Sequence, residues 1–133
     1  MKLTVASQMP IEKVEEFLRT TEHINKDSLL KDGYVVEVNE QIKGCFVLST
    51  LEDGSYWLKQ LYIAKEAAQN LPVLLETIIV MVKGMEAKKL YVHSHQPVVD
   101  ILLDALQFHP QKEAITVNNF SRKEGNWWAY DVS

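Results

Sequence analysis

The sequence is poor in cysteine and glycine, and neither charge is in strong excess. Cys45 is the only cysteine, so the chain cannot form an internal disulfide and nothing implies an oxidising compartment. A formal net charge of −4 lacks the basic footprint of a nucleic-acid-binding surface. The sequence also has no apolar run of about 18 residues and does not begin with the apolar stretch of a signal peptide. We therefore expect a soluble cytoplasmic protein with no nucleic-acid or membrane partner.

The remaining composition is that of an ordinary globular chain. Of its residues, 47% are hydrophobic and 24% are charged, which excludes a disordered or fibrous protein. A chain of 133 residues is close to the commonest domain size and can bury roughly two thirds of its unfolded surface. We expect one domain over residues 1–133.

The first part of the sequence predicts a short strand and two helices. Residues 3–6 are β-prone and are followed by turn-forming residues. Apolar residues then recur at helical spacing, which predicts an amphipathic helix over residues 10–21. A shorter helix is expected over residues 25–30, with Asn25 as its N-terminal cap.

Two hairpins follow these helices. Runs of β-branched and aromatic residues predict strands over residues 34–38, 42–50 and 55–63. Turn-forming residues separate the runs at positions 39–41 and 52–54. Because the connections are this short, we expect the three strands to form an antiparallel meander.

The middle of the sequence predicts a crossover between two parallel strands. An apolar helix is expected over residues 71–83, ended by Gly84, and a further strand over residues 89–93. A helix placed between two strands of one sheet requires those strands to run parallel. The strand over residues 55–63 is therefore expected to lie parallel to the strand over residues 89–93.

The last part of the sequence predicts one more helix and two more strands. The helix is expected over residues 98–106, and the strands over residues 114–120 and 127–132, with a turn at 122–126. Together these elements predict an α+β protein. Its mixed, mostly antiparallel sheet would have about seven strands, with flanking helices and a central β-α-β crossover.

This element order, covering nearly the whole chain, resembles that of the GNAT superfamily of N-acetyltransferases. Three apolar signposts support the resemblance: Leu61-Tyr62-Ile63 before the crossover helix, Leu90-Tyr91-Val92 after it, and Leu106-Gln107-Phe108 at the end of the next helix. The resemblance implies acetyl-CoA or another acyl-CoA as cofactor, with no metal. It implies as acceptor a small-molecule amine, or the N-terminus or a lysine of a protein.

In the GNAT superfamily, a bulge turns the strand before the crossover helix away from the strand after it. The pantetheine arm of acyl-CoA pairs there with the exposed edge of the first strand. The resemblance therefore implies that Leu61, Tyr62 and Ile63 bind the cofactor. Such a contact uses backbone groups and tolerates changes in sequence.

The loop that holds the diphosphate of CoA in this superfamily is degenerate here. The family pattern is Gln or Arg, two residues, Gly, one residue, then Gly or Ala. Aligning Gln69 with the first position places Pro72 and Leu74 at the small-residue positions. Pro72 has no N–H to donate, and Leu74 adds a side chain where phosphate should meet backbone. The backbone amides of Gln69, Asn70 and Leu71 remain as the implied cofactor ligands.

The charged and catalytic groups of the superfamily are also incomplete. Lys65 and Glu66, the charges nearest the loop, cancel each other. The position at which the family often has a tyrosine acid is Leu103, and the strand over residues 55–63 has no glutamate to act as base. The chain therefore resembles a divergent member.

Histidines are the remaining candidates for the base. His93 and His95 lie two residues apart at the end of an expected strand, and His109 follows later. Histidine accepts protons near neutral pH, so His93 and His95 are our candidate catalytic residues. The alternative is that they are ordinary solvated surface histidines. We expect no metal site, because no carboxylate or cysteine lies at a familiar ligand spacing from these histidines.

Three further residues have both a structural and a functional interpretation. Cys45 lies in an apolar strand and is expected to be buried as a small hydrophobic residue rather than to act as a nucleophile. Trp127 and Trp128 should face opposite sides of their strand. The outward tryptophan could line a ligand groove or a homodimer interface, or a neighbouring helix could cover it.

Two functions from different classes remain open. The first is an acyl-CoA-dependent N-acetyltransferase with an unusual phosphate loop. The second is a catalytically inactive ligand-sensing or protein-interaction module that keeps the fold. The missing glycine, tyrosine and glutamate favour the second function, whereas the usual activity of the fold favours the first.

Overall fold

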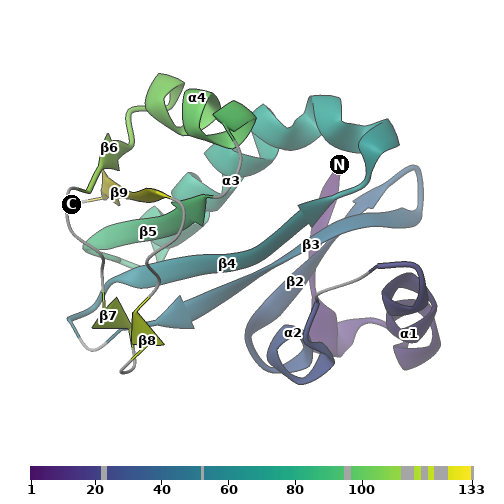
Figure 1. Ribbon diagram of the computed structural model, residues 1–133. Helices are drawn as coiled ribbons and strands as arrows, with labels where there is room; N and C mark the ends of the chain where they lie inside the picture. The colour runs from purple at the N-terminus through teal and green to yellow at the C-terminus, as the bar shows by residue number, and fades with distance from the viewer. Residues whose placement is uncertain are drawn as a thin grey trace. The chain divides into compact units, whose positions relative to one another are not determined.

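The structure is a computed structural model that describes residues 1–21, 24–51, 53–94, 97–111, 116–117, 120–121 and 126–132 (Figure 1). The chain divides into two compact units. Unit 1 consists of Met1–Ser49 and Lys59–Leu71, and unit 2 of Thr50–Leu58 and Pro72–Ser133. The single domain over residues 1–133 stays a prediction.

The strands of unit 1 include the first expected hairpin, formed by β2 and β3. β1 (Lys2–Val5) pairs with β2 (Gly33–Val38), and β2 pairs with β3 (Gln41–Thr50), both antiparallel. The next strand, β4 (Tyr56–Ile63), is the neighbour of β3. At its end, the amide of the following residue, Ala64, donates to the Lys43 carbonyl of β3 at 2.6 Å.

The helices of unit 1 begin where local signals place them. A 3-10 helix, η1 (Ala6–Gln8), precedes α1 (Ile11–Arg19) and α2 (Lys26–Asp32). The side chain of Asn25 accepts a hydrogen bond from the Ser28 amide at 2.9 Å, which confirms the predicted cap of α2. The buried residues of this unit form a cluster: Ala6, Val14, Phe17, Leu29, Val35, Cys45 and Val47.

Unit 2 contains the expected crossover. β4 pairs with β5 (Lys89–Ser94) in parallel, and α3 (Leu71–Gly84) lies between them in sequence, as Figure 1 traces. α4 (Pro97–Ala105) follows β5. The helices supply much of the buried apolar surface of this unit. Its fully or nearly fully buried residues include Leu58, Leu74, Leu75, Ile78, Val82, Leu90, Leu103 and Phe108.

The C-terminal strands differ from the prediction. β9 (Asn126–Asp131) pairs antiparallel with β5 and also with β6 (His109–Pro110), which the sequence did not indicate. The single strand predicted over residues 114–120 is wrong, because β7 (Thr116–Val117) and β8 (Phe120–Ser121) pair antiparallel with each other.

The complete strand order is β1-β2-β3-β4-β5-β9-β6, with β7-β8 as a separate pair. This seven-stranded mixed sheet with helices confirms the predicted α+β class. No helix in the described ranges is both long and apolar enough to pass through a bilayer.

Candidate functional site

β4 changes conformation at Gln60. Its parallel register with β5 comprises three residues, Tyr56, Trp57 and Leu58. Two residues later, Gln60 has φ of +53°, in the left-handed region that residues with a Cβ rarely adopt. A left-handed residue interrupts the regular alternation of a strand, as a β-bulge does. A distortion of this kind is what the GNAT resemblance implies for this strand.

Neighbours in unit 1 hold Gln60 in this conformation. Its Oε1 accepts a hydrogen bond from the Asn25 amide at 2.9 Å, and its carbonyl lies 3.8 Å from the Sγ of Cys45, which donates to it. Cys45 is fully buried, and burial raises the pKa of its thiol to about 12. The thiol is therefore protonated at neutral pH, which suits a weak donor and not a nucleophile. The predicted burial of Cys45 is confirmed.

Leu61, Tyr62 and Ile63, which follow the distortion, are partly buried, and their backbone N–H and C=O groups do not all point to the same edge of the strand. Because Ala64 donates to β3, and backbone groups of alternate residues point to the same edge, Tyr62 also faces β3. The Tyr62 carbonyl accordingly lies against Gly44. The backbone groups of Leu61 and Ile63 point to the opposite edge. Of the three predicted cofactor residues, these two direct their amides and carbonyls away from β3.

Residues 64–70, which connect β4 to α3, contain a 3-10 helix. This helix, η2 (Lys65–Asn70), runs directly into α3, and the amide of Leu71 donates to the Ala68 carbonyl. Within this stretch, the amide of Ala67 donates to the Ala64 carbonyl at 2.9 Å, three residues back, as is typical of a 3-10 helix. The amide of Leu71, implied as a cofactor ligand, is therefore already in use, and Pro72 has none.

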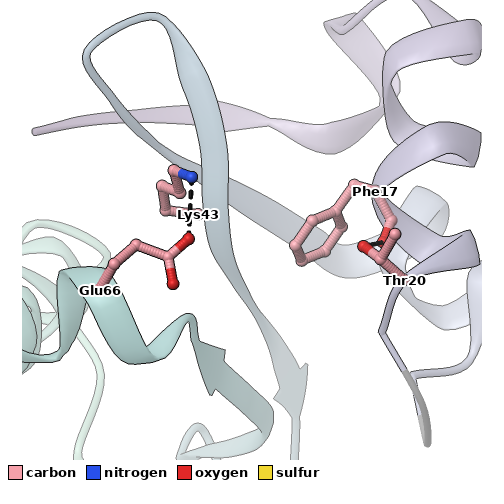
Figure 2. A network of polar contacts seen from close by, with 4 residues as sticks. All are labelled: Phe17, Thr20, Lys43 and Glu66. Carbon is pink, nitrogen blue, oxygen red and sulfur yellow. Dashed lines mark hydrogen bonds and ion pairs between the residues drawn. The ribbon is translucent and has the colours of Figure 1, made fainter.

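Glu66 lies in the first turn of η2 and pairs with a residue of β3. Its Oε1 is 2.9 Å from the Nζ of Lys43, and Figure 2 shows the two side chains turned toward each other. This hydrogen bond, the backbone N–H of Glu66 itself and the positive charge of Lys43 lower the pKa of the Glu66 carboxyl. The sequence pairs Glu66 with its neighbour Lys65 and does not indicate Lys43, because a partner 23 residues away leaves no local signal.

Two positions important to the family pattern belong to the core of unit 2. Leu74 is fully buried, so its side chain packs inside the unit instead of covering the start of α3 as predicted. Leu103, at the family's tyrosine position, is also fully buried. Pro72 is exposed, and its missing N–H is the departure that remains at the surface.

The predicted histidines have different environments. His93 lies on β5, is partly buried, and its ring centroid is 4.8 Å from that of Trp127. The ring centroid of Trp127 in turn lies 5.7 Å from that of Trp57, so His93 adjoins an aromatic cluster. Both interpretations of His93 stay predictions. His95 lies outside the described residues. His109 is exposed on β6.

Trp128 is covered by a helix of the same unit. It is 8% exposed, and its indole N–H donates to the Oδ1 of Asp100 on α4 at 2.7 Å. The alternative in which a helix covers the outward tryptophan is therefore confirmed, and an exposed interface at Trp128 is wrong. A homodimer stays a prediction. Among the residues that the structure describes, no three His, Cys, Asp or Glu side chains are placed to bind one metal ion.

Comparison with known proteins places this geometry in a fold. No protein-family model and no curated sequence matches the chain. Solved structures do match it, over nearly its whole length. They include a GNAT-family acetyltransferase from Staphylococcus aureus Mu50, with TM-score 0.74, 15% identity and 99% of each chain covered.

Two further structures have known ligands or substrates. An acetyltransferase of Bacillus subtilis, solved in complex with CoA, has TM-score 0.71 and 13% identity, with 98% of this chain and 97% of that chain covered. The ribosomal-protein-S18-alanine N-acetyltransferase of Escherichia coli has TM-score 0.73 and 11% identity, with 99% and 94% covered. From the strand order, the parallel crossover and these likenesses, the chain has the fold of the GNAT N-acetyltransferases.

Proposed function

We propose that this protein is an acyl-CoA-dependent N-acetyltransferase that binds the pantetheine arm of its donor along β4. The observation that carries the proposal is the left-handed Gln60, followed by an Ala64 amide that donates to β3. From this bond and the alternation of a strand, we infer that the backbone groups of Leu61 and Ile63 point away from β3. An extended amide-containing arm can pair with such an edge as an added strand does. Support comes from the Bacillus subtilis neighbour, which has the same fold and was solved with CoA.

The reaction transfers an acetyl group from sulfur to nitrogen. The lone pair of a neutral acceptor amine attacks the thioester carbonyl carbon, so that a C–N bond forms and the carbonyl electrons move to oxygen. When they return, the C–S bond breaks and the CoA thiolate leaves. The amine loses a proton to a base and the thiolate gains one, giving an amide and a thiol. A backbone N–H near Ile63 is our candidate to polarise the carbonyl.

We assign the role of proton acceptor to His93. Its ring is fixed against Trp127 at 4.8 Å, and a fixed imidazole is a suitable base near neutral pH. His95 stays a second candidate. The acceptor is a primary amine, either a small molecule or the N-terminus or a lysine of a protein. The Escherichia coli neighbour, whose substrate is a ribosomal protein, supports the protein alternative.

The second candidate function is a non-catalytic binding module. It is favoured by the Leu71 amide, which donates to Ala68, and by the buried leucine at position 103. In each case a group that the reaction commonly uses is missing: a free backbone amide before α3, and a tyrosine acid at position 103. A module of this kind would bind a donor or a partner protein without releasing thiol.

Calorimetric titration with acetyl-CoA and measurement of thiol release with a panel of amines separate the two functions. Ile63→Pro removes one outward amide and leaves the hydrogen bond between Ala64 and Lys43, since proline is tolerated at a strand edge. We expect acetyl-CoA binding to weaken at least tenfold in this variant. Ile63→Val keeps the amide and should bind as the natural chain does. Absence of binding at millimolar acetyl-CoA would refute the proposal.

A further inference from the structure

A carboxylate of the chain itself, that of Glu66, lies at the amino end of η2. The Glu66 carboxylate receives the Lys43 ammonium at 2.9 Å and its own backbone N–H, and its side chain is 62% exposed (Figure 2). The Lys43 side chain is 25% exposed, so the cation is partly enclosed while the carboxylate faces solvent. An approaching phosphate therefore meets a negative charge first.

The amides around this position are committed to the chain itself. Ala67 donates to the Ala64 carbonyl at 2.9 Å and Leu71 donates to Ala68. Gln69 and Asn70 lie within η2, where the 3-10 pattern directs amides to carbonyls three residues back. A diphosphate needs several amide donors or cationic side chains, and the stretch from Ala64 to Leu71 has one lysine and one glutamate.

The edge of β4 and the start of η2 thus differ in what they offer a ligand. At β4, Leu61 and Ile63 direct neutral backbone groups outward, which suits the amides of a pantetheine arm. At η2, the Glu66 carboxylate and the occupied amides oppose a multiply charged group. Both segments belong to unit 1 and are joined through Ala64.

We propose that this protein recognises its acyl donor through the pantetheine arm and does not bind the diphosphate of the nucleotide. Its donor class is then the pantetheine thioesters, including those that lack the adenine nucleotide. The inference depends on the proposed binding of pantetheine at β4. It goes beyond that proposal because it names the part of the donor that carries recognition and the residue pair, Lys43 and Glu66, that excludes the rest.

The first test compares acetyl-CoA, acetyl-pantetheine and 3′-phospho-ADP by calorimetric titration. We expect the dissociation constants of the two thioesters to agree within about threefold, and no binding of 3′-phospho-ADP at millimolar concentration. A tenfold or greater preference for acetyl-CoA would overturn this inference and leave the proposed function intact. If neither thioester binds, the proposed function is refuted, and the inference with it.

The second test looks for a gain of affinity, which a folding defect cannot imitate. Glu66→Gln removes the carboxylate and frees the Lys43 ammonium for a phosphate. We expect acetyl-CoA to bind at least fivefold more tightly to this variant, while acetyl-pantetheine binds as before. Glu12→Gln, an equal charge change at an exposed position of α1, should leave both affinities unchanged. Equal tightening in the two variants would show a general charge effect and refute the role of Glu66.

Discussion

The backbone of Gly44 on β3 lies against the carbonyl of Tyr62 on β4. A Cβ atom at position 44 would be 2.6 Å from the Tyr62 oxygen and 3.3 Å from the Cα of Ile63. The first distance is shorter than real contacts allow, and its partner is a backbone atom that cannot rotate away. Glycine at position 44 therefore permits the close approach of β3 to the segment proposed to bind pantetheine.

Gly44→Ala should destabilise the protein for this reason. We expect a loss of about 1 to 3 kcal/mol in the free energy of unfolding, as for other overpacked sites, measured by urea denaturation. Gly84→Ala is the matched control, because nothing lies within 4 Å of a Cβ at that position. Since alanine favours helix over glycine, this control should be neutral or stabilising by up to about 1 kcal/mol. Equal destabilisation by both substitutions would contradict the contact.

Cys45 should make stability fall at alkaline pH. Burial raises the pKa of its thiol to about 12, from an ordinary value of 9.0. Between these values the unfolded chain releases the thiol proton and the folded chain keeps it, so the folded state binds more protons and loses stability as pH rises. The stabilising effect is complete below about pH 9 and is lost toward pH 12. Denaturation at several pH values measures it, and Cys45→Ala should show a shallower decline.

The same burial predicts slow chemistry at the thiol. In the native protein at pH 8, Cys45 should not react with a disulfide reagent on the timescale of an activity assay, and it should react fully in guanidinium. Rapid native reaction would show that the strand opens locally. If Cys45 does not react, the same disulfide reagent can be used to follow acetyl transfer, because the colour that develops then comes from the thiol of the CoA product.

The hydrogen bond between Trp128 and Asp100 should contribute to stability. Asp100→Leu leaves the buried indole N–H without this acceptor and should cost about 1 to 3 kcal/mol in unfolding free energy. Asp100→Asn keeps an oxygen acceptor and should cost less. Asp104→Leu, at an exposed position on the same helix, is the control and should change the free energy little. Indole fluorescence in urea follows all three variants.

Local chemistry made much of this fold predictable from sequence. Asn25 caps α2 through its own side chain. The helical spacing of the apolar residues in α3 can be read from the sequence of that segment alone. The crossover then follows, because the helix between β4 and β5 requires these strands to be parallel. Each of these features depends on residues close together in the chain.

The candidate site was less predictable, because it depends on pairs distant in sequence. Lys43 forms a hydrogen bond with Glu66, 23 positions away, and Trp128 forms one with Asp100, 28 positions away. Weak binding of a diphosphate, which the missing glycine in this loop favours, stays a prediction. In the structure, Leu74 is buried in the core of unit 2, and the amides of Ala67 and Leu71 donate to carbonyls three residues back.

The Lys43 and Glu66 pair should be visible in the titration of the carboxyl group. Its pKa is lowered in the folded state, so its contribution to stability is present above the unfolded pKa and is lost as pH falls through the folded one. In Lys43→Met, the ¹³C signal of the Glu66 carboxyl should titrate at higher pH than in the natural chain. Lys13→Met, at an exposed position of α1, should leave that signal unchanged. An unmoved signal in Lys43→Met would exclude the pair in solution.

His93 should determine how the rate of acetyl transfer depends on pH. If its imidazole accepts the amine proton, only enzyme with a neutral ring is active, so kcat/KM rises with pH. His93→Gln removes this rise and lowers kcat/KM at pH 7 by about 10²-fold or more, the usual range for a general base. His109→Gln, at an exposed position on β6, should keep both the rate and the profile. A His93→Gln enzyme with an unchanged pH profile would assign the base elsewhere, and His95→Gln would then be the variant to measure.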